Sequence, residues 1–183
     1  MEVFIIKKIY LFNRVSIISR LSMLLLLLGI ILLFAGCSSS VKSTSQDKNI
    51  TAIKTVLKHQ FTGPDIDVVE LLESPAELDQ YYEKRYKSYF TENMYKSFIA
   101  ANAYHYLFMA HNNGQQLKVD TVDVENIEST KSDYTFKVVV LIDKKGRNQK
   151  SAEVSGRVSF NKEGKITSIR NLDDGGLIKE LRN

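Results

Sequence analysis

The sequence predicts an α+β domain in which N-terminal helices pack on a curved antiparallel β-sheet. Two observations lead to this prediction. Apolar residues recur at helical spacing as far as Asn112, and beyond Gly114 they alternate with polar residues at a period of two. Short polar turns separate the alternating segments, as in strands joined by hairpins. Because helices precede strands rather than alternating with them, one helical layer on one sheet is the simplest way to bury both apolar faces.

A leader precedes this domain, and its pattern concerns location. Four basic residues and one acid stand before the apolar run LSMLLLLLGIILLFAGC at residues 21–37. The strictly apolar part ends at Phe34, so it is shorter than the roughly 20 residues of a membrane-spanning helix and suits the core of a signal peptide. The basic residues predict that the N-terminal end stays in the cytoplasm and that the Cys37 end faces outside.

The end of the leader resembles a bacterial lipoprotein signal. Small residues, Ala35 and Gly36, stand before the only cysteine, Cys37, and a serine run follows. The resemblance implies cleavage before Cys37 and a diacylglycerol on its sulfur, which anchors the chain to the outside of the cell membrane through acyl chains worth about 0.8 kcal/mol per buried methylene. The family prefers Leu where this chain has Phe34. The alternative is an uncleaved membrane helix with an unmodified Cys37.

We therefore divide the chain into a signal peptide at residues 1–36, a Ser-rich flexible tether at 37–49 and one domain at 50–183. Of the whole-chain net charge of +4, four bases against one acid place +3 in the leader, so the remainder gives no indication of nucleic-acid binding. With Cys37 committed to lipid, disulfides, zinc–thiolate sites and cysteine nucleophiles are excluded.

Helices are predicted at residues 50–61, 65–72, 76–90 and 92–112. Gly63 and Pro64 end the first helix, and Pro75 suits the first position of the third. Thr91 is the expected N-cap of the last helix, which Gly114 follows.

Strands are predicted at residues 117–127, 134–142, 152–160 and 166–172. Within the first, Val119 and Val122 lie out of phase, which predicts a β-bulge and a bent sheet. Asp173 and Asp174 precede two glycines, and we expect a solvated turn here rather than a calcium site. A brief helix is expected at residues 177–181.

Several segments of the domain carry a resemblance to a known family. The segments FTGPD, YFTENMYKSFIAAN, SGRVSFNKEGKITSI and DDGG are similar to those of small lipoproteins from Gram-positive, Bacillus-type bacteria. The domain of those proteins is a nuclear transport factor two-like (cystatin-like) cone, and the resemblance covers about residues 50–177. The matching residues concern packing and turns, so they imply a fold rather than an activity.

Tyrosines are concentrated in the predicted helices, where they suit either a pocket wall or simple packing on the sheet. The ligand-pocket candidates are Tyr82, Tyr86, Tyr95, Phe98, Tyr104 and His105. At the mouth of a cone His105 is a weak candidate for a catalytic base, and the alternative is a histidine at the edge of the core. His105 and His111 are six residues apart on a helix, so they do not share a metal. No metal or cofactor is predicted.

These patterns leave three functions open. The first is a non-enzymatic, lipid-anchored extracytoplasmic module that binds a protein partner of the envelope or a small hydrophobic ligand. The second is a pocket enzyme of isomerase or dehydratase type with His105 as the base. The third is an accessory subunit of an envelope or conjugation complex. The motifs of the common nucleotide-binding and hydrolytic sites are absent from the sequence, which disfavours those enzyme classes.

Overall fold

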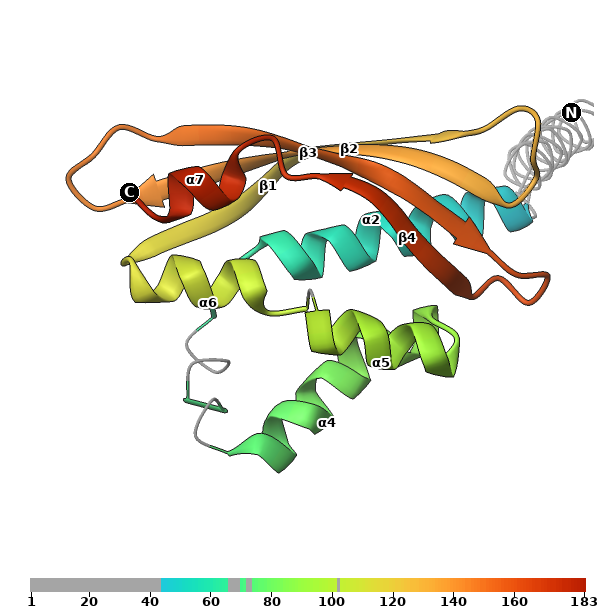
Figure 1. Cartoon of the computed structure of the whole chain (residues 1–183), viewed down its shortest axis with the longest axis horizontal. Helices are drawn as coiled ribbons and strands as arrows, with labels where there is room; N and C mark the ends of the chain where they lie inside the picture. Colours follow the sequence, from blue (N-terminus) through green and yellow to red (C-terminus); the bar gives the residue numbers. More distant parts are fainter. Residues whose placement is uncertain (1–43, 66–69, 72–73, 102) are drawn as a thin grey trace, which may run out of the picture. The chain divides into compact units, whose positions relative to one another are not determined.

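The computed structural model describes residues 44–65, 70–71, 74–101 and 103–183 (Figure 1). The chain divides into two units, Met1–Lys42 and Ser43–Asn183. The leader and Cys37 belong to the first unit and lie outside the described residues, as does most of the helix predicted at residues 65–72. The elements of the second unit are α2 (Ser45–Phe61), α4 (Pro75–Tyr86), the 3-10 helix η1 (Lys87–Tyr89), α5 (Glu92–Ala101), α6 (His105–Asn112), β1 (Gln115–Asn126), β2 (Asp133–Lys144), β3 (Lys150–Phe160), β4 (Ile166–Asp173) and α7 (Leu177–Leu181).

The four strands form one open antiparallel sheet in the order β1-β2-β3-β4. The predicted meander is confirmed, and so is the bulge in β1, because the register against β2 shifts between Val119 and Thr121. After the shift, Val122 and Val124 of β1 lie on the same face as Val138 and Phe136 of β2. The bulge therefore keeps apolar residues on one face of a bent strand.

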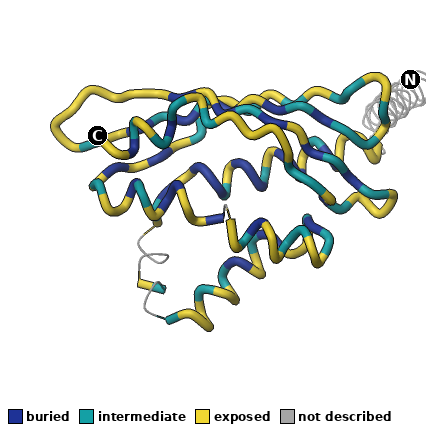
Figure 2. Tube along the Cα trace, in the orientation of Figure 1, coloured by how far each residue is buried: buried dark blue, intermediate teal, exposed yellow. Residues whose placement is uncertain are grey.

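Helices cover only one face of this sheet in the part of the chain that is described (Figure 1). We call this the inner face. Along β2 and β3, buried and more exposed residues alternate (Figure 2), and Val138, Val140 and Val154 of the inner face are completely buried. The α+β architecture predicted from the change of periodicity is confirmed, with helices packed on an open sheet.

Helix α2 lies along the inner face and supplies much of the core. Ile53, Val56 and Phe61 are at most 2% exposed, at the spacing of one helical stripe. The helix begins at Ser45, five residues before the predicted start, so the last part of the expected tether is helical. The cause is a capping box in which Thr44 and Asp47 bond each other's backbone N–H groups.

The predicted helix at residues 92–112 is two helices, α5 and α6, and the expectation of a continuous helix is wrong. The backbone N–H of Ala103 donates to the carbonyl of Phe98, five residues back, which interrupts the regular four-residue pattern. Ala103 is completely buried and Tyr106 packs on Phe61 with 5.0 Å between ring centroids. Tertiary packing thus turns α6 onto α2, although no glycine or proline signals a break.

Helix α4 starts at Pro75 as predicted and has Tyr82 and Tyr86 as its only buried residues. It ends at Tyr86, where η1 follows, rather than continuing to residue 90. At the other end of the domain, α7 packs against α6 and β3, with Leu177 and Leu181 completely buried. The Asp174 carboxylate accepts hydrogen bonds from the backbone N–H groups of Gly176 and Ile178, so this acid caps a turn.

Candidate functional site

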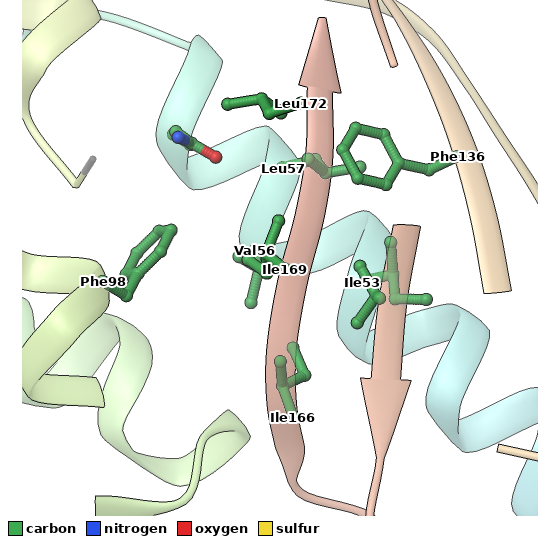
Figure 3. Close-up of a pocket in the computed structure, with 10 residues that line it drawn as sticks. Ile53, Val56, Leu57, Phe98, Phe136, Ile166, Ile169 and Leu172 are labelled. Carbon is green, nitrogen blue, oxygen red and sulfur yellow. The ribbon is translucent and has the colours of Figure 1, made fainter. Parts of the chain in front are cut away.

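The space between α2, α5 and the inner face of the sheet is nearly filled. Its cavity of about 20 Å³ has room for about one water molecule. Phe98 reaches into it from α5 toward Val56 of α2 and Ile169 of β4 (Figure 3). The lining is apolar except for Gln60, and its residues are Ile53, Val56, Leu57, Gln60, Phe98, Phe136, Val158, Ile166, Ile169 and Leu172.

Among the six residues predicted to line a pocket, Phe98 alone lines this cavity. It is completely buried, stacks on Phe90 at 4.7 Å between centroids and meets the ring of Tyr86 at 5.1 Å. Phe98 therefore works as a packing residue that joins the helices to the sheet.

Three of the predicted tyrosines come together beside Phe98. The ring of Tyr82 lies 6.0 Å from that of Tyr86 and 5.6 Å from that of Tyr104. Burial raises the pKa of both Tyr82 and Tyr86, and Tyr104 adds to the rise at Tyr82. The hydroxyl of Tyr82 is buried and bonds to no described residue. The arrangement is an aromatic cluster between α4 and the residue before α6, in which the hydroxyls of Tyr82 and Tyr86 stay protonated.

Tyr95 and His105 lie apart from this cluster. Tyr95 is half-buried on α5, where burial, followed by the charges of Glu83 and Asp79, raises its pKa. His105 is exposed at the start of α6, with the Tyr106 ring 5.6 Å away. The break before α6 separates His105 from the Phe98 stripe, and no described carboxylate partners it. This geometry gives the enzyme interpretation no support.

The side chain of His59, which is not among the predicted site residues, lies between α2 and α4. The edge of the His59 ring faces Tyr86 at 5.7 Å, and its Nδ1 is buried without a described partner. Burial, followed by the positive charge of Arg85, lowers the pKa of His59. The Arg85 guanidinium lies 4.6 Å from the centroid of the Tyr81 ring and 3.6 Å from the Asp65 carboxylate. Tyr81 and Arg85 are four residues apart on one helix, and this spacing alone predicts that their side chains are neighbours.

The other face of the sheet, which we call the outer face, carries an open hollow of about 490 Å³. One cross-strand row contains Glu125 of β1, Thr135 of β2 and Arg157 of β3. The next row contains Asp123, Lys137 and Ser155. In the sequence these residues are only the polar positions of alternating strands, because one strand's pattern does not reveal which residues become neighbours across the sheet.

Irregular pairing between β3 and β4 borders this hollow. Their register shifts between Ser155 and Arg157, and Asn171 in β4 adopts a φ of 52°. Asparagine tolerates this left-handed conformation better than most residues do. Gly156 and Asn171 both line the hollow. Bulged strands bend locally and change the direction of their side chains, which accounts for a concave outer surface here.

No cluster of three or more His, Cys, Asp or Glu residues in the described part of the chain is placed to hold a metal ion. None of the described helices is long and apolar enough to cross a membrane. Comparison of the chain with models of protein families, with curated proteins and with solved structures found no match.

Proposed function

We propose that this chain is a lipid-anchored extracytoplasmic module that binds a protein partner through the outer face of its sheet. The anchor is the diacylglycerol that the lipoprotein-like signal implies at Cys37. The domain is, in this proposal, an open relative of the nuclear transport factor two-like cone of Gram-positive lipoproteins. An envelope or conjugation complex is one setting in which such a partner occurs.

The observation that carries the proposal is the contrast between the two sides of the sheet. The cavity on the inner side holds about one water molecule, whereas small-molecule sites typically measure about 300–1,000 Å³. The outer side has a hollow of about 490 Å³ that no described helix covers. This contrast supports binding at a surface over enclosure of a small hydrophobic ligand.

The anchor is tested by labelling cells that express the full chain with a clickable fatty acid. We expect the wild-type chain to carry the label and fractionate with membranes, and Cys37→Ser to lose both properties. A Cys37→Ser chain that stayed in the membrane fraction without label would instead support an uncleaved membrane helix.

The binding surface is tested by photo-crosslinking in intact cells of the native host. A photoreactive residue replaces Lys137 on the outer face or, as the control, Lys96 on α5. The two lysines are a matched pair, because both are exposed and both pair with a glutamate, Glu153 and Glu92 respectively. We expect a discrete crosslinked protein from position 137 only. Equal products from both positions would contradict a specific outer surface.

A further inference from the structure

We infer that the outer-face hollow is a binding site for a short peptide segment carrying both charges, with an ammonium group at Asp123 and Glu125 and a carboxylate at Arg157. This inference rests on the proposed function and specifies the chemistry of the partner. It depends on three features of the described residues: the separation of the two acids from Arg157 across the strands, their lack of internal neutralisation, and the hydroxyl side chains beside them.

The charged residues of the hollow that form no ion pair with a described residue are separated by strand, whereas Lys137 of β2 pairs with Glu153 of β3. The acids Asp123 and Glu125 stand on β1, and Arg157 stands two strands away on β3, with Arg170 opposite it on β4. Cross-strand neighbours of like charge destabilise a sheet, and opposite charges are the favourable arrangement. The two facing arginines therefore lower stability, which is the expected signature of a surface arranged for a partner.

The same charges are not neutralised within the described part of the chain. Lys137 is the cross-strand neighbour of Asp123, yet its ammonium lies 3.5 Å from Glu153. Arg170 donates to the Ser159 hydroxyl at 3.1 Å and does not contact a carboxylate. Asp123, Glu125 and Arg157 form no ion pair with any described residue.

The floor of the hollow carries two small hydroxyl side chains, Thr135 and Ser155, together with Lys137, which lies between Asp123 and Ser155 in the second row. Thr135 separates Glu125 from Arg157 within one row, and Ser155 lies in the next row. Thr135 and Ser155 are half-buried, and neither hydroxyl bonds to another described residue. These hydroxyls are placed to bond to the amides of a peptide backbone.

The separation of the charges selects the class of ligand. Adjacent strands lie about 4.8 Å apart, so β1 and β3 are about 10 Å apart. The α-ammonium and carboxylate of a free amino acid, like the two charges of a zwitterionic lipid headgroup, are only a few bonds apart and do not span about 10 Å. In an extended peptide, alternate residues face the same side at about 7 Å between their Cα atoms, and flexible side chains add the remaining reach. A Lys-Xaa-Glu segment therefore fits.

The experiment uses the compact unit at residues 43–183, labelled with ¹⁵N, at low ionic strength. The probe is acetyl-Lys-Ala-Glu-amide, titrated to about 5 mM so that a complex as weak as about 1 mM is detected. We expect saturable chemical-shift changes at the backbone amides of Thr135 and Ser155. These changes should diminish in about 0.5 M salt, because the screening length there is well below the roughly 10 Å found at about 0.1 M. Acetyl-Gln-Ala-Glu-amide and acetyl-Lys-Ala-Gln-amide are the matched single-charge controls, and both should bind more weakly.

Charge reversal distinguishes recognition from a general surface effect. Glu125→Arg and Arg157→Glu should each weaken peptide binding about tenfold, because attraction of order 0.7 kcal/mol becomes repulsion of similar size. The double variant should recover part of the binding, since the peptide can then bind in the opposite direction while Asp123 keeps its charge. Failure of the probe to shift these amides, or equal binding by all variants, would overturn the inference.

Another outcome would replace the inference rather than support it. The separated charges of the outer face also complement those of a second copy of the same face. Sedimentation at the NMR concentration would then show a dimer that dissociates in the single reversals and is unaffected by the peptide. The proposed function fails separately, when positions 137 and 96 crosslink alike in cells, whatever the peptide titration shows.

Discussion

The two faces of the sheet use the same four strands in opposite ways. On the inner face, Phe136, Val138 and Val140 of β2 are at most 2% exposed under the helices. On the outer face, Lys137 of the same strand is exposed and its neighbours are charged or hydroxylated. Burial of apolar area stabilises the inner face strongly, whereas surface charge pairs contribute little. The inner face therefore accounts for most of the stability, and substitutions on the outer face should change stability little.

The largest expected effect is on the inner side. Phe98→Ala should lower the free energy of unfolding by about 3–5 kcal/mol, because it empties a site that is fully packed between Phe90, Tyr86 and the sheet. Phe108→Ala is the matched control, since Phe108 is 46% exposed. Urea denaturation measures both, and similar losses in the two variants would contradict the described packing.

Removing the hydroxyl group from each of two buried tyrosines should change the free energy of unfolding differently. The hydroxyl of Tyr134 accepts a hydrogen bond from the Asn49 side chain at 3.2 Å, so Tyr134→Phe should cost about 1–3 kcal/mol. The hydroxyl of Tyr82 is buried without a described partner, so Tyr82→Phe should be neutral or stabilising by up to about 1 kcal/mol. If Tyr82→Phe were the more destabilising change, that hydroxyl would have a partner in solution.

A smaller effect is expected from pH at the contact between α2 and α4. Burial and then Arg85 hold the pKa of His59 below its usual value of 6.5. A histidine whose folded pKa is lowered stabilises the fold above the unfolded value, and this contribution is lost as the pH falls through the folded value. We expect the difference in urea midpoint between about pH 7.5, above the usual histidine pKa, and about pH 5, below it, to be smaller in His59→Gln than in the wild type. An equal difference would place His59 outside the folded contact.

The smallest effect concerns the outer face. Arg157→Glu should raise the free energy of unfolding by about 0.2–1 kcal/mol, because a like-charged pair with Arg170 becomes an opposite pair. Lys137→Glu should lower it by a similar amount, since it places like charge beside Glu153. Thermal denaturation at low salt measures both changes. A loss of stability in Arg157→Glu would mean that this arginine has a structural role.

The strands were predictable because their information is local. Alternation along each strand assigns residues to faces, and the phase change between Val119 and Val122 located the bulge. The start of α2 is also encoded locally, in the capping box of Thr44 and Asp47, although the serine-rich composition around it is typical of a tether.

The candidate site was less predictable because it depends on contacts between distant residues. The break between α5 and α6 comes from packing of Tyr106 on Phe61 and burial of Ala103, and it moves His105 away from the expected stripe. The outer-face hollow depends on cross-strand register, which brings Glu125, Thr135 and Arg157 into one row. The pairing register between strands cannot be read from the pattern of any one strand.

The central claim, that the interior is filled and that the proposed binding takes place at the surface, is tested most directly by native mass spectrometry of the domain purified from its native host. We expect the mass of the bare polypeptide, because the cavity of about 20 Å³ holds about one water molecule. A hydrophobic molecule that stays bound in the native spectrum and is lost on denaturation would contradict the claim and make the inner side of the sheet the binding site.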